Sequence, residues 1–137
     1  MILCMAKKHN AAVVLDSCVW IAFLCDVDSQ HSKACKLVKT LCSEILVPEY
    51  VLIEVATVLR QKKYNAEACA FVEKVVNDPA VFLPAQNSVY GAARLFCTDK
   101  RSALSFVDTV LFELSTAYEV VTFDNALAKA MLKKAKK

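Results

Sequence analysis

The chain has 137 residues, which suits one domain with a single hydrophobic core. Hydrophobic residues make up 57% of it and charged residues 23%, a balance that excludes an intrinsically disordered protein. The longest uninterrupted apolar stretch, Cys18 to Cys25, has eight residues, far fewer than the ~18 to 20 of a membrane span. The first residues place apolar side chains before lysines, the reverse of a signal peptide, and we therefore expect a cytoplasmic protein.

Apolar patterning predicts four short strands that alternate with helices along the whole chain. The predicted strands cover residues 12–16, 45–47, 80–83 and 119–123. The predicted helices cover residues 17–25, 29–42, 48–62, 65–77, 87–97, 103–116 and 125–135. Strands that alternate with helices form a parallel sheet covered on both faces, so we expect a three-layer α/β fold. We expect one domain over residues 1–137, with an N-terminal extension at 1–10 and a basic tail at 132–137.

Four acidic residues interrupt or close apolar runs of this pattern. Asp16 and Asp124 follow the first and last predicted strands, and Glu54 and Asp108 lie inside apolar helices. None of the four has a lysine or arginine within four residues. Because an unpaired ionised carboxylate is costly in an apolar interior, we expect these acids to share one partner, a divalent cation.

Each acid also has a simpler interpretation. Asp16 and Asp124 stand at strand-to-helix junctions, where aspartate is a preferred N-cap. Glu54 and Asp108 could each be satisfied by a backbone amide, a hydroxyl or a distant arginine. The metal hypothesis therefore depends on all four acids together. Carboxylates select Mg²⁺ or Mn²⁺, and such ions support hydrolysis of a phosphodiester bond.

The cysteines favour no metal site. Seven occur without a Cys-x-x-Cys pair, which argues against a zinc site or a disulfide framework. His31 and Cys35 share one face of a predicted helix, but no second ligand pair stands out, so we expect a structural or solvent-facing role for them.

The segments around the four acids resemble those of a known family. They read Val-Val-Leu-Asp16-Ser-Cys-Val-Trp-Ile-Ala, Val-Pro-Glu-Tyr-Val-Leu-Ile-Glu54-Val, Leu-Ser-Phe-Val-Asp108 and Val-Val-Thr122-Phe-Asp124-Asn-Ala-Leu. In this order they resemble PIN-domain ribonucleases, of the type of the VapC toxins of toxin–antitoxin modules. The resemblance covers residues 12–130 and implies a PIN-like three-layer fold.

The resemblance also implies roles for individual residues. Asp16, Glu54, Asp108 and Asp124 match the family's acidic quartet, which binds Mg²⁺ or Mn²⁺ and cleaves RNA. Glu54 would be a ligand or the group that positions the attacking water. Ser17 and Thr122 match hydroxyl residues that support the metal site in this family, with a helix cap or an ordinary strand residue as the simpler interpretation of each. Separately from the resemblance, we expect basic residues to hold the RNA backbone, with Arg94, Lys100 and Arg101 as the candidates.

For partners, the resemblance implies a homodimer and a cognate antitoxin protein. The sequence also leaves two other interpretations of the function open. One is an RNA-processing PIN nuclease that has no antitoxin. The other is a PIN-fold binding or assembly module with little nuclease activity, against which the complete quartet counts.

Overall fold

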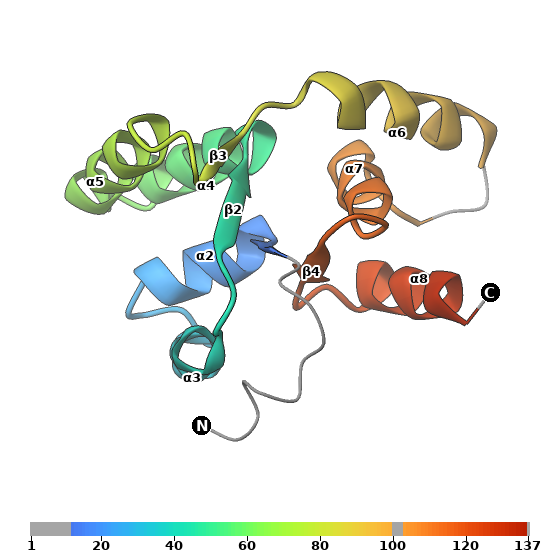
Figure 1. Ribbon diagram of the computed structural model, residues 1–137. Helices are drawn as coiled ribbons and strands as arrows, with labels where there is room; N and C mark the ends of the chain where they lie inside the picture. The colour runs from blue at the N-terminus through green and yellow to red at the C-terminus, as the bar shows by residue number, and fades with distance from the viewer. Residues whose placement is uncertain (1–11, 100–102, 137) are drawn as a thin grey trace.

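A parallel four-stranded sheet runs through the centre of the molecule (Figure 1). The computed structural model describes residues 12–99 and 103–136. Neighbouring strands are parallel throughout, and the predicted parallel sheet is therefore confirmed. The central strand sets the register, since Val14 faces Leu46 on one side and Val120 on the other. The strands lie in the order β3-β2-β1-β4 and span Val13–Leu15 (β1), Ile45–Pro48 (β2), Phe82–Leu83 (β3) and Glu119–Val121 (β4).

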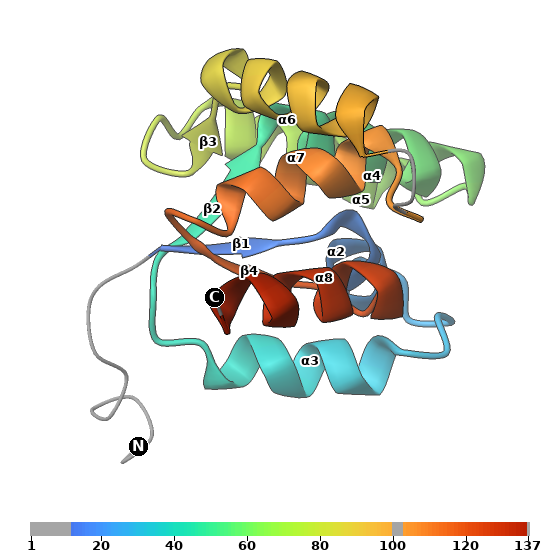
Figure 2. The same ribbon diagram turned by 90° about the vertical axis from the view of Figure 1, so that its right-hand side faces the viewer.

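Helices cover both faces of this sheet, as the alternating pattern predicts. The described helices are α2 (Ser17–Leu24), α3 (His31–Thr40), α4 (Glu49–Gln61), α5 (Asn65–Val76), α6 (Gln86–Thr98), α7 (Phe106–Leu114) and α8 (Asn125–Ala135). In Figure 2 the sheet lies between a layer formed by α4 to α7 and a layer that contains α3 and α8. The three-layer α/β arrangement is confirmed. No helix in the described part of the chain has the length and apolarity that a bilayer span requires.

The central strand β1 supplies side chains to both layers. Val14 belongs to a buried cluster with Val55 of α4 and Leu111 of α7. Val13 and Leu15 point to the opposite face, where they pack with residues of α2 and α3. Successive side chains of a strand alternate between its faces, so a strand covered on both sides is apolar throughout. This explains the unbroken apolar run that precedes Asp16.

Four helix starts differ from the sequence prediction. Helices α3 and α6 begin at His31 and Gln86, within two residues of the predicted starts at 29 and 87. Helix α4 begins at Glu49, because Pro48 keeps an extended backbone as the last residue of β2 and serves as the N-cap. Helix α7 begins at Phe106 and not at residue 103, because the side chain of Ser105 caps it. At the other end of the chain, α8 continues to Ala135, so the first part of the predicted basic tail is helical. The predicted extension at residues 1–10 lies outside the described residues.

Candidate functional site

The most buried acidic side chain follows the central strand directly. Asp16 is 5% exposed and caps the N-terminus of α2. Its Oδ1 accepts a hydrogen bond from the Ser17 amide at 2.7 Å and lies 3.3 Å from the Ser17 hydroxyl. The Asp16 amide donates to the Val121 carbonyl at 2.9 Å, which fixes the residue against the end of β4. The N-cap role predicted for Asp16 is confirmed, and Ser17 supports it.

One threonine hydroxyl links this acid to a second one. The Thr122 hydroxyl donates to Asp16 Oδ2 at 2.7 Å and accepts from the Asp124 amide at 2.9 Å. Asp124 is exposed, and its Oδ1 accepts from the Leu127 amide at 2.9 Å as the N-cap of α8. The link joins the loops that follow β1 and β4, which are neighbours in the sheet. Thr122 therefore orients Asp16 and holds it beside Asp124.

The Cys18 thiol also lies beside the Asp16 carboxylate, and the sequence analysis did not identify it as part of the site. The Cys18 thiol donates towards Asp16 Oδ2 at 3.5 Å, and the Phe123 amide donates to its sulfur at 3.5 Å. Its position two residues after Asp16 was visible in the sequence. The direction of its side chain depends on the contact between α2 and the loop after β4, which no local pattern shows.

The third acid, Asp108, comes from α7. It is half-buried and forms a capping box with Ser105, in which each backbone amide donates to the other side chain at 3.1 Å. The charge of Asp108 contributes to the electrostatic environment of Asp16. The two carboxylates therefore lie within electrostatic reach of one another.

Burial and charge act together on Asp16. Burial raises the pKa of its carboxyl group above the ordinary value, and the negative charge of Asp108 adds to that rise. Hydrogen bonds from Thr122, Ser17 and Cys18 oppose the rise without cancelling it. A positive charge near Asp16 would offset the remaining cost of ionisation, which is what a bound cation supplies.

Helix α4, which packs against α2, brings the fourth acid. Glu54 is half-buried, and its Oε2 is buried without a hydrogen-bond partner. Four residues earlier, the Tyr50 hydroxyl is also buried, and it interacts with the Ser88 side chain. Burial raises the pKa of Tyr50, the interaction with Ser88 opposes that rise, and the charge of Asp16 adds to it. Tyr50 is thus a second residue that sequence reasoning missed, although its spacing from Glu54 was visible.

The carboxylates do not form a ready-made ligand cluster. Across residues 12–99 and 103–136, no three acidic, histidine or cysteine side chains are grouped so that they could hold a metal ion. Asp16, Asp108 and Asp124 each accept a backbone amide at a helix N-terminus, as the simpler interpretation of these acids allowed. Of the four acids, only Glu54 has a buried oxygen without a hydrogen-bond partner.

The chemistry of the donors nevertheless fits Mg²⁺ or Mn²⁺. All four side chains offer oxygen, the donor that these hard ions prefer. Mg²⁺ is commonly held by one or two carboxylates and keeps several waters, so a closed cage of protein ligands is unnecessary. A cation would stabilise two of these carboxylates most. Burial raises the pKa of Asp16, and Glu54 has a buried oxygen without a hydrogen-bond partner.

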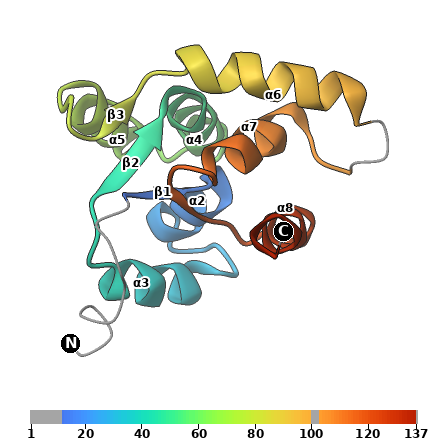
Figure 3. The same cartoon turned by 45° about the vertical axis from the view of Figure 1, so that its right-hand side comes forward.

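The basic residues expected at the RNA backbone are only partly described. Arg94 is exposed on α6, which lies alongside α7, the helix that carries Asp108 (Figure 3). Lys100 and Arg101 lie outside the described residues.

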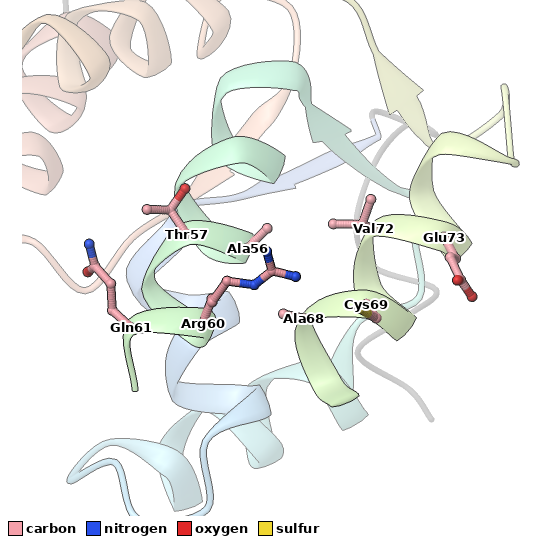
Figure 4. Close-up of a pocket in the computed structure, with 8 residues that line it drawn as sticks. All are labelled: Ala56, Thr57, Arg60, Gln61, Ala68, Cys69, Val72 and Glu73. Carbon is pink, nitrogen blue, oxygen red and sulfur yellow. The ribbon is translucent and has the colours of Figure 1, made fainter. Parts of the chain in front are cut away.

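A separate cleft of about 490 Å³ lies between α4 and α5 (Figure 4). Its lining residues come only from these two helices, and none of the candidate acids is among them. Likewise, His31 and Cys35 make a local contact, and His31 Nδ1 lies 2.8 Å from the Ala22 carbonyl oxygen, which supports the structural role expected for them.

Comparison with known proteins agrees with this architecture. The family model described as PIN domain matches residues 13–131. The fold is similar to the crystal structure of VapC20 from Mycobacterium tuberculosis, described as a sarcin–ricin loop cleaving toxin. That similarity has a TM-score of 0.76 with 19% sequence identity, and covers 87% of this chain and 95% of the other. A search of curated proteins finds no significant match.

Proposed function

Because the chain belongs to the PIN-domain family, we propose that it is a metal-dependent endoribonuclease that hydrolyses phosphodiester bonds of RNA. One observation carries the proposal. The buried Asp16 carboxylate is held beyond the end of β1, joined through Thr122 to the loop of Asp124 and within electrostatic reach of Asp108. This is the edge of a parallel sheet at which α/β proteins bind ligands.

The proposed cofactor is Mg²⁺ or Mn²⁺, held by Asp16, Asp108 and Asp124. Glu54 is either a further ligand or the group that positions the attacking water. When bound, the ion supplies positive charge to the phosphodiester and favours ionisation of a water molecule. The oxygen donors, the raised pKa of Asp16 and the unpartnered oxygen of Glu54 support this assignment.

The chain's own residues prepare the site for a charged substrate. Ser17 and Thr122 fix the two oxygens of Asp16, so the carboxylate keeps one orientation. Asp16 and Asp124 are N-caps, and Asp108 lies in the first turn of its helix. The positive ends of these helices partly offset the repulsion between the carboxylates and favour a phosphate nearby.

Basic residues would hold the RNA backbone beside these acids. Arg94 is exposed on α6, and Lys100 and Arg101 follow that helix in the sequence. Contacts to phosphate position an RNA without reading its sequence, so this surface would not set the cleavage site.

We propose that the protein is the toxin of a toxin–antitoxin pair. We further propose that it acts in the cytoplasm as a homodimer. The fold similarity to a protein described as a toxin supports this role. Exposed apolar side chains on α4, α6 and α7 support a protein partner or a second copy, since patches of this kind mark interaction sites. They are Ile53, Tyr90, Phe96 and Phe106. Toxicity on expression that a co-expressed neighbouring gene relieves would separate a toxin from an RNA-processing nuclease.

The nuclease proposal is tested by incubating the purified protein with total RNA. Mn²⁺ or Mg²⁺ should support cleavage, whereas a chelator or the Asp16→Asn substitution should abolish it. Asp78→Asn is the matched control, because Asp78 caps a turn before β3, and this variant should cleave as the wild type does. Cleavage by Asp16→Asn at the wild-type rate would end the assignment and leave the binding or assembly module as the better account.

A further inference from the structure

Strand β4 forms one edge of the sheet. Among the described strands it pairs with β1 alone. The Glu119 amide and the Val121 carbonyl both form hydrogen bonds with residues that flank β1. Because the backbone groups of successive strand residues point to opposite sides, the N–H and C=O of Val120 point away from β1. An edge of this kind can accept a strand from another chain.

A groove of about 730 Å³ lies on the outer side of β4. Residues of β4, of α8 and of the turn after α7 line it, and no described residue of β1 or β2 does. The side chains of β4 are half-buried or exposed, whereas all three of β1 are buried. On α8 the groove is lined by an apolar stripe of Ala128, Met131, Leu132 and Ala135, of which Leu132 is 62% exposed. The groove thus combines a strand edge with an apolar wall.

A lysine fixes the walls of this groove. Lys134 Nζ donates to the Phe112 carbonyl at 2.8 Å and to the Thr116 hydroxyl, and it lies 4.4 Å from the centre of the Phe112 ring. These contacts join the last turn of α8 to the end of α7, and β4 lies between the two helices (Figures 1 and 3). The groove is therefore formed before any partner binds, which lowers the entropic cost of binding.

The border of the groove is positively charged. Helix α8 and the residue that follows it contain four lysines and no acid. Three of these lysines, Lys129, Lys133 and Lys136, are exposed. Of the described residues that line the groove, Glu119 is the only acid. Charge complementarity therefore favours an occupant with acidic side chains.

The chain itself is a poor electrostatic match for the groove. Pairing of β4 with β4 of a second copy would bring two lysine-rich α8 helices together, and like charges that meet at an interface oppose binding. Residues 1–11 contain two lysines and no acid. A segment of a different protein, with acidic residues, suits the groove better than either.

We propose that the outer edge of β4 binds an extended, acidic segment of a partner protein, which joins the sheet as an additional strand. The backbone of the segment pairs with Val120, its apolar side chains fill the groove beside Leu132, and its acidic side chains lie near the α8 lysines. Strand addition of this kind obtains affinity from main-chain hydrogen bonds and specificity from the side chains. The inference goes beyond the proposed nuclease, because it concerns a protein ligand and can be tested without RNA.

The test uses the full-length protein and a fluorescein-labelled peptide, Glu-Glu-Val-Thr-Val-Val-Glu-Glu. Fluorescence anisotropy at low salt should show that this peptide binds at least about ten-fold more tightly than the same peptide with lysine in place of glutamate. N-methylation of its four central amides removes the N–H groups that pair with a strand edge. That change should weaken binding by at least about ten-fold.

Leu132→Asp tests the apolar wall of the groove. It should weaken binding of the acidic peptide by at least about ten-fold, because an apolar contact is lost and a like charge is introduced. Its melting temperature should stay near the wild-type value, because Leu132 is exposed. Val76→Asp is the matched control, since Val76 is 52% exposed at the end of α5 and does not line the groove. The control should bind the peptide within about two-fold of the wild type.

Several results would overturn the inference. Equal binding of the acidic and the lysine peptides would remove the charge argument, and wild-type affinity in Leu132→Asp would place the peptide elsewhere. Undiminished binding of the N-methylated peptide would exclude strand addition. Absence of peptide binding by the wild type would also overturn it. In that case, a wild-type dimer that Leu132→Asp converts to a monomer in sedimentation would show that a second copy covers the edge.

Discussion

Replacing Thr122 with valine isolates the hydroxyl that joins two acids of the site. Valine keeps the branched shape of threonine and exchanges the hydroxyl for a methyl group. Thr122→Val therefore removes the donor 2.7 Å from Asp16 Oδ2 and the acceptor 2.9 Å from the Asp124 amide. The substitution also removes a longer contact, of 3.7 Å, between the Thr122 hydroxyl and the Cys18 sulfur.

The first of these two bonds sets the size of the effect. A hydrogen bond to a charged group contributes about 1.5–3 kcal/mol, and Asp16 is too buried for water to replace the lost donor fully. Asp124 is exposed, so water can satisfy its amide at little cost. The Cys18 thiol, 3.5 Å from the same Asp16 oxygen, keeps a weak donor in place. We expect the free energy of unfolding to fall by about 2 kcal/mol at neutral pH.

Urea unfolding at neutral pH in the presence of a chelator measures this change. Thr40→Val is the matched control, because the Thr40 hydroxyl donates only to the Leu37 carbonyl at the exposed end of α3. The control should stay within about 0.5 kcal/mol of the wild type. If Thr122→Val is no less stable than Thr40→Val, then Thr122 does not hold Asp16 as described. Metal-dependent cleavage should also fall about 10- to 100-fold, as expected when a residue that orients a metal ligand is lost.

Two further predictions concern protonation and thiol reactivity. Because burial raises the folded-state pKa of Asp16, its contribution to stability is fully present below the unfolded pKa and is lost as the pH rises through the folded pKa. The metal-free wild type should therefore gain stability relative to Asp16→Asn as the pH falls through that range. Urea unfolding over a pH series measures the gap, and a gap that moves the other way would contradict the assignment. Burial also raises the pKa of the Cys18 and Cys25 thiols, whereas Cys69 and Cys97 are exposed. Iodoacetamide at mildly alkaline pH should label the exposed pair first in peptide mass spectra, and earlier labelling of Cys18 would show that the thiol is not shielded beside Asp16.

The order of strands and helices along the chain could be predicted, because each strand and helix has a local signal in the sequence. The apolar run before Asp16 is typical of a buried parallel strand, and the helix that follows begins at a preferred capping residue. The spatial order of the strands could not be predicted, because it depends on contacts between distant segments. The start of α7 was missed because the apolar pattern extends past Ser105, and only the capping box marks the boundary.

The candidate site was predictable in part for the same reason. Asp16 and Asp124 stand at junctions visible in the sequence, and both are N-caps as predicted. Backbone amides donate to Asp16, Asp108 and Asp124, and such contacts leave no trace in the spacing of charged residues along the sequence. Cys18 and Tyr50 were missed because their side-chain directions are set by packing between elements. Among the four acids, Glu54 alone has a buried oxygen without a hydrogen-bond partner.

The central claim is that acids from separate parts of the chain share one divalent cation. Titration with Mn²⁺, followed by the paramagnetic resonance of the free ion, measures this directly without any substrate. The wild-type protein should bind Mn²⁺, and Asp16→Asn, Asp108→Asn and Asp124→Asn should each weaken binding by at least about ten-fold. Asp78→Asn, outside the site, should bind as the wild type does. Equal Mn²⁺ affinity in the wild type and in all three site variants would contradict a shared metal site.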